Sequence, residues 1–181
     1  MGMRKAVDYL CLYDPEFDGY AQRSQTEWGG SSDICEVKTL DGLKAAISGY
    51  SNIKFLEVAL HGTPGMIYFA DEMAMKGDFL GYLTQGTPFL QAGARILFDN
   101  CSIGKGPVGD NFMDGIGKHM LIGKGGIVGA STVDNGVCWP KFQFGRGLHF
   151  TSNDGRLKVY KYDTKGNRSA SMVVDAKGNR Y

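Results

Sequence analysis

The sequence contains no long apolar run. No stretch approaches the roughly 18 to 20 uninterrupted apolar residues that are needed to cross a bilayer. The first five residues are not followed by the apolar core and cleavage site of a signal peptide. We therefore expect no membrane partner and a cytoplasmic location, with export that needs no cleaved signal peptide as the alternative.

An excess of charge of either sign is also missing. The 20 basic and 19 acidic side chains leave a formal net charge of +1. Binding to nucleic acid depends on basic residues that neutralise phosphates, and no such surplus exists here. We expect no nucleic-acid partner.

Cysteine is sparse and widely spaced. The four cysteines are Cys11, Cys35, Cys101 and Cys138, and no two of them form a CxxC pair. Zinc sites and disulfide frameworks both depend on closely patterned cysteines. The sequence therefore predicts free thiols, no metal site and no cofactor.

Glycine is abundant by contrast. The chain has 27 glycines, roughly twice the number that an average usage of about 7% would give, and they gather around expected turns. With 43% apolar residues, a chain of 181 residues can bury the core of one domain. Neither a linker nor an internal repeat divides it, so we expect a single domain over 1–181, in which 142–181 form a β-rich C-terminal extension.

Apolar strands alternate with amphipathic segments along most of the chain. Expected strands lie at 5–13, 34–37, 55–60, 66–69, 95–100, 125–130, 157–162 and 169–174, and expected helices lie at 39–48, 78–84 and 110–121. Residues 18–32 are polar and predict a loop with at most a short helical piece. This alternation predicts an α/β fold with a mostly parallel central sheet sandwiched by helices, followed by a C-terminal β-hairpin.

Two of the central strands end at residues suited to catalysis. The strand at 55–60 runs directly into His61, and the strand at 95–100 runs directly into Cys101. Ligands of parallel α/β sheets bind outside the carboxyl ends of the strands. A thiolate is a nucleophile, and a nearby imidazole takes up or delivers protons. The spacing predicts a Cys101–His61 dyad at one edge of the sheet.

Small residues flank both members of this dyad. A tetrahedral intermediate needs backbone N–H groups that reach its oxyanion without obstruction by side chains. The amides of Gly62 and Cys101 are our candidates. The glycine-rich turn at 104–109 leads into an expected helix, whose amino terminus would lower the pKa of the Cys101 thiol.

The motifs FLEVALHGTPGMIYF, ARILFDNCSIGKGPVGDNFMDGIGKHM and GGIVGAST lie between Phe55 and Thr132. Together they resemble the caspase and gingipain group of cysteine peptidases, clan CD, and are most similar to its bacterial caspase-like domains. The resemblance implies a caspase-like fold and a cysteine endopeptidase that acts on a protein or peptide. It implies Cys101 as the nucleophile, His61 as the proton carrier and Gly62 beside the oxyanion.

The resemblance also implies where a substrate side chain would bind. In this clan the specificity pocket is built from the ends of three strands, which here points to Asp14, Ser102 and Ser131, with Thr132 and Asp134 nearby. The residues around Cys101 differ from the short signatures of true caspases, so cleavage after aspartate is not implied.

Two other functions are open on the sequence alone. The missing specificity signature fits a catalytically inactive caspase-like module that binds or regulates another protein, or a secreted bacterial effector. The same thiol site would also suit an acyl transferase or hydrolase that acts on a molecule smaller than a protein. The oligomeric state is not indicated by the sequence.

Overall fold

A large mixed β-sheet organises the chain. The structure is a computed structural model that describes residues 3–69, 72–75, 88–99, 101–133, 137–138, 149–150, 156–175 and 179–181. For the strands at 72–75, 137–138 and 149–150 only the backbone is described.

The seven-stranded sheet has the order β3-β2-β5-β9-β10-β13-β14. Its strands are β2 (Tyr9–Tyr13), β3 (Ser32–Glu36), β5 (Ile53–Ala59), β9 (Leu90–Phe98), β10 (Gly126–Ser131), β13 (Arg156–Tyr162) and β14 (Arg168–Asp175). The first five strands in this order pair in parallel, whereas β13 and β14 are antiparallel to their neighbours. When the five parallel strands are numbered by their order in the chain, they lie side by side in the order 2-1-3-4-5. The side of the sheet on which successive strands are added therefore changes beside β2.

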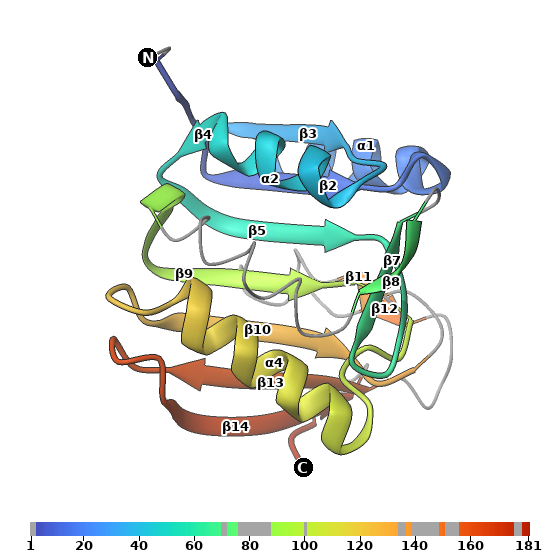
Figure 1. The fold of residues 1–181 in the computed structure, drawn as a ribbon, viewed down its shortest axis with the longest axis vertical. Helices are drawn as coiled ribbons and strands as arrows, with labels where there is room; N and C mark the ends of the chain where they lie inside the picture. Colours follow the sequence, from blue (N-terminus) through green and yellow to red (C-terminus); the bar gives the residue numbers. More distant parts are fainter. Residues whose placement is uncertain are drawn as a thin grey trace.

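Helices cover both faces of this sheet. In Figure 1, α2 (Leu40–Ser48) and α4 (Gly106–Met120) lie in front of the strands, and α1 (Asp18–Trp28) lies behind β2 and β3. Helix α2 begins where the Thr39 side chain accepts a hydrogen bond from the amide of Gly42 at 3.0 Å. Helix α4 buries its apolar residues at helical spacing, including Phe112 and Ile116.

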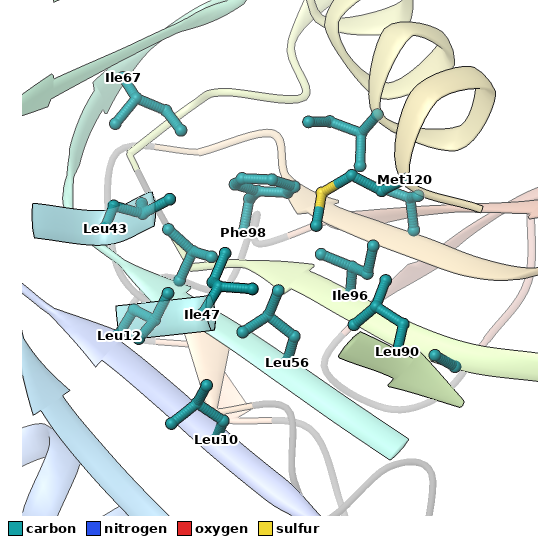
Figure 2. Close-up of a cluster of buried hydrophobic side chains, with 14 of the residues drawn as sticks. Leu10, Leu12, Leu43, Ile47, Leu56, Ile67, Leu90, Ile96, Phe98 and Met120 are labelled. Carbon is teal, nitrogen blue, oxygen red and sulfur yellow. The ribbon is translucent and has the colours of Figure 1, made fainter. Parts of the chain in front are cut away.

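The larger hydrophobic core lies between the sheet and the front helices. Figure 2 shows Leu43 and Ile47 of α2 and Met120 of α4 against side chains of the central strands, among them Leu56 and Phe98. These strand residues are fully or almost fully buried. Phe55–Ala59 of β5 and Ile96–Phe98 of β9 are covered on both faces, and apart from Glu57 their residues are apolar.

The smaller core, behind the sheet, contains a group of aromatic side chains. Trp28 at the end of α1 stacks on Tyr9 of β2, with ring centroids 4.8 Å apart, and also contacts Phe55 of β5. Helix α1 buries only Ala21 and Ser24 fully. It is attached to the sheet mainly by large aromatic residues at its two ends, not by an apolar stripe.

Three smaller sheets flank the central one. The strands β6 (His61–Thr63), β7 (Met66–Phe69) and β8 (Glu72–Met75) form an antiparallel sheet at the carboxyl end of β5. The strands β1 (Lys5–Ala6) and β4 (Tyr50–Ser51) pair in parallel, and β11 (Val137–Cys138) pairs with β12 (His149–Phe150).

The α/β composition, the helices at 39–48 and 110–121 and the C-terminal hairpin are confirmed. The loop expected at 18–32 is wrong, because residues 18–28 form α1. The strand expected at 5–13 is interrupted, since β1 pairs with β4 and only β2 enters the main sheet. Helix α4 begins at Gly106, inside the expected glycine-rich turn. The helix expected at 78–84 lies outside the described residues.

Replacement of Gly117 tests the contact between α4 and β13. A Cβ atom at Gly117 would lie 2.3 Å from the ring of Tyr162, whose hydroxyl is fixed by a 2.9 Å hydrogen bond to Asp114. We predict that Gly117→Ala lowers the free energy of unfolding by roughly 1–3 kcal/mol, although alanine favours helix. In the control Gly19→Ala, the new Cβ meets nothing within 4 Å, so stability should stay equal or rise. Urea unfolding measures both, and an unaffected Gly117→Ala variant would contradict the packing.

Candidate catalytic site

His61 and Cys101 follow adjacent parallel strands. The register of β5 and β9 places Val58 opposite Phe98. His61 and Cys101 each come three residues after these partners in the chain. Both residues therefore follow the carboxyl ends of adjacent parallel strands, and both are partly exposed.

A direct contact joins the segments that carry these two residues. The hairpin of β6 and β7 turns at Gly65, whose amide donates a 2.9 Å hydrogen bond to the carbonyl of Ile103, two residues after Cys101. A Cβ atom at Gly65 would lie 2.7 Å from the carbonyl oxygen of Val108 in the first turn of α4. The His61 hairpin is thus packed against the Cys101 loop.

The amide of Gly62 points away from its partner strand. In the β6–β7 ladder His61 pairs with Tyr68, Gly62 with Ile67, and Thr63 with Met66. Pro64 has no N–H, so the pair next to the turn must be the hydrogen-bonded one. Hydrogen-bonded pairs alternate along an antiparallel ladder, and Gly62 therefore occupies a non-hydrogen-bonded position. Its N–H group is directed to the outside of the hairpin.

Backbone hydrogen bonds attach the loop after Cys101 to β10 and to the residues that follow β10. Ser102 donates its amide to Val133 at 2.7 Å, and Gly104 donates its amide to Ser131 at the same distance. Ser102 has φ of 52°, a left-handed conformation that is uncommon outside glycine. Such a conformation persists only where the surroundings hold it, which fixes the direction in which the chain leaves Cys101.

Two of the expected substrate-binding hydroxyls are used within the fold. The Ser131 hydroxyl donates to the Val133 carbonyl at 3.1 Å, and the Thr132 hydroxyl donates to the Arg156 carbonyl at 3.0 Å. Ser102 and Ser131 are almost completely buried. These residues therefore stabilise the backbone next to the Cys101 loop. Asp134 lies outside the described residues.

Asp14 is placed differently. It follows β2 directly, and its amide donates to the carbonyl of Ala59 at 2.9 Å, two residues before His61. Its side chain has no exposed surface. One carboxyl oxygen accepts the amide of Glu16 at 3.1 Å, and Oδ2 has no hydrogen-bond partner among the residues that the structure describes. A buried polar atom without a partner is costly, so this oxygen is a candidate ligand-binding atom.

Two further residues at His61 were not found from the sequence. Glu16 and Phe17 belong to η1 (Pro15–Phe17), a single turn that Asp14 caps and Pro15 starts. Glu16 Oε2 lies 3.2 Å from His61 Nε2, and the rings of Phe17 and His61 have centroids 4.9 Å apart. The signal for this turn in the sequence is the Asp14-Pro15 pair, in which Asp14 caps the turn and Pro15 begins it.

The other thiols differ in their surroundings. Cys11 is fully buried in β2, where burial raises the pKa of its thiol well above the ordinary value. Cys35 is half-buried, with its sulfur 3.1 Å from the Tyr50 hydroxyl. Of Cys138 only the backbone is described. Cys11 is therefore an inert core thiol, and Cys101 is distinguished by its place beside the His61 hairpin.

In the described part of the chain, no group of three histidine, cysteine or acidic residues is arranged to hold a metal ion. No described helix has the length and apolar character that crossing a membrane requires. Comparison with protein-family models found no match, and neither did comparisons with curated proteins and with solved structures.

Replacement of Gly65 tests the contact between the two segments. Gly65→Ala places a Cβ against Val108 at a residue with φ of 72°. Gly93→Ala is the matched control, since φ there is 75° and a Cβ would meet nothing within 4 Å. Both variants carry left-handed strain of about 1–2 kcal/mol. We predict that Gly65→Ala loses more stability than Gly93→Ala in thermal unfolding and alone changes the alkylation rate of Cys101. Equal behaviour of the two would contradict the contact.

Proposed function

We propose that this chain is a caspase-like cysteine endopeptidase that uses a Cys101–His61 dyad. The observation that carries the proposal is the equal placement of the two residues after paired positions of β5 and β9. The parallel strand order with an antiparallel strand after it, and the Gly65 contact between the two segments, support it.

The proposal assigns each chemical step to one of these groups. The Cys101 thiolate attacks the scissile carbonyl carbon, and a C–S bond forms while the carbonyl oxygen becomes an oxyanion. The outward amide of Gly62 donates to that oxyanion. His61 protonates the leaving amine as the C–N bond breaks. Water then hydrolyses the thioester, His61 takes up a proton from it, and the Cys101 thiolate is regenerated.

Glu16 gives His61 a defined orientation in this scheme. A carboxylate beside Nε2 favours the tautomer in which that nitrogen carries the proton, and it leaves Nδ1 for the proton transfer. The pair is solvent-exposed, with side chains 40% and 71% accessible for His61 and Glu16, so its contribution to stability is small. Its effect is on orientation.

The unpartnered oxygen of Asp14 suggests the class of substrate residue. A buried carboxyl oxygen without a hydrogen-bond donor is satisfied best by a cationic side chain. We propose that lysine or arginine beside the scissile bond reaches Asp14. The chain would then cleave after a basic residue.

A catalytically inactive binding module is the competing hypothesis. Its support is that the Ser131 and Thr132 hydroxyls are engaged within the fold, which leaves Asp14 as the specificity determinant among these three residues. A module of this kind would keep its biological effect when Cys101 is replaced by alanine.

Selective alkylation tests the dyad. We predict that brief treatment with iodoacetamide at neutral pH modifies Cys101 at least roughly tenfold faster than Cys35, and that His61→Ala reduces this preference, because the imidazole favours the thiolate. Peptide mapping by mass spectrometry measures both sites in one sample. The half-buried Cys35 is the internal control. Equal labelling of the two thiols in the wild-type protein would refute an activated Cys101.

Cleavage of a peptide library tests the proposed substrate class. We predict that Asp14→Asn lowers kcat/KM for substrates with arginine or lysine before the scissile bond by roughly 100-fold, as expected for loss of a buried charge partner. The amide retains the oxygen that accepts the Glu16 amide, so η1 should stay in place. Peptides with glutamine at the same position are the control. A uniform loss over all peptides would indicate a structural role for Asp14.

A further inference from the structure

A buried carboxyl group lies on the opposite face of β5 from the larger core. Glu57 has no exposed surface, and its two oxygens accept the hydroxyl groups of Tyr9 on β2 and Tyr20 on α1. Glu57 thereby joins three elements, the central strand β5, its neighbour β2 and the helix behind them. Because α1 buries little else, this bridge is a main part of its attachment to the sheet.

Helix α1 is continuous with the segment that contacts His61. The turn η1 ends at Phe17 and α1 begins at the next residue. The amide of Phe17 donates to the carbonyl of Asp14 at 2.8 Å. A movement of α1 away from the sheet would therefore draw Glu16 and Phe17 away from the imidazole.

We propose that Glu57 is a positioning residue that holds α1 on the sheet and, through α1, holds Glu16 and Phe17 against His61. This attachment of α1 weakens as the pH rises. The part of this inference that concerns His61 rests on the proposed function. The attachment of α1 by Glu57 does not.

Burial and nearby acidic groups favour the neutral form of Glu57. Burial raises the pKa of Glu57 to about 8, and the negative charge of Asp99 at the end of β9 adds to this effect. The tyrosine hydroxyls act in the opposite direction, and Glu27 of α1 acts in the same direction as Asp99. Among the described residues, Cys11 and Tyr13 of β2 and Arg95 of β9 also lie on this face.

The sign of the pH effect follows from proton binding. The ordinary pKa of glutamate is 4.5, so between pH 4.5 and about 8 Glu57 keeps its proton when α1 is closed and loses it when α1 opens to water. Opening then becomes more favourable as the pH rises, by up to about tenfold per pH unit. Above about pH 8 both states are ionised and the dependence ends.

Hydrogen exchange of α1 in wild-type protein and Glu57→Gln is the test. Glutamine has the same shape, accepts a tyrosine hydroxyl and has no charge at any pH. We predict that the exchange rate of the peptide covering 17–28 in wild type, divided by the rate in Glu57→Gln at the same pH, rises at least roughly tenfold from pH 5.5 to pH 7.5. A ratio that stays constant would overturn the proposal.

A second measurement needs no variant. The side-chain carboxyl carbon of Glu57, labelled with ¹³C in the wild-type protein, should titrate near pH 8 in NMR spectra. A titration near the ordinary glutamate value would overturn the proposal even if Glu57→Gln failed to fold.

Alkylation of Cys101 in the same samples separates this inference from the proposed function. We predict that the His61-dependent part of the rate persists to higher pH in Glu57→Gln than in wild type. If alkylation depends on His61 but is equal in both proteins, the link from Glu57 to the site is wrong. If alkylation never depends on His61, the proposed function fails, and the exchange result alone decides whether Glu57 holds α1.

Discussion

The parallel pairing of β5 with β9 is the constraint on which the rest of the site depends. β5 and the last part of β9 are covered on two faces, so their register is fixed by apolar side chains that point alternately into the two cores. A slip of one residue would turn Glu57 from the rear face to the larger core. The same register pairs Val58 with Phe98, and His61 and Cys101 each follow three residues later in the chain.

The hairpin and the helices refine this placement. Gly65 brings the β6–β7 hairpin against the Cys101 loop, while β10 and its following residues hold that loop through Ser102 and Gly104. On the other side, Asp14 and η1 bring Glu16 and Phe17 to the imidazole. The proposed chemistry therefore draws on the carboxyl ends of β2, β5 and β9, three adjacent strands of one sheet.

The sequence was sufficient to predict the elements whose burial follows a simple period. Helix α2 was of this kind. The apolar runs at 55–60 and 95–100 predicted two central strands, but β9 begins at Leu90 and ends at Phe98, so it does not run directly into Cys101. Helix α1 was missed because it is anchored by Tyr20 and Trp28 and not by an apolar stripe, so its period is weak. The roles of Ser131 and Thr132 depend on backbone carbonyls that come together only in the folded chain, such as that of Arg156, and no local pattern encodes them.

The most direct test of the central claim is a chemical bridge between positions 61 and 101. In a His61→Cys variant, dibromobimane becomes fluorescent when it links two neighbouring thiols, and peptide mapping identifies the linked pair. The account predicts a bridge between the introduced thiol and Cys101 in the folded protein, and none in a Lys54→Cys variant at the opposite end of β5. If both thiols of the His61→Cys variant are alkylated singly while no bridge forms, the two residues do not make one site.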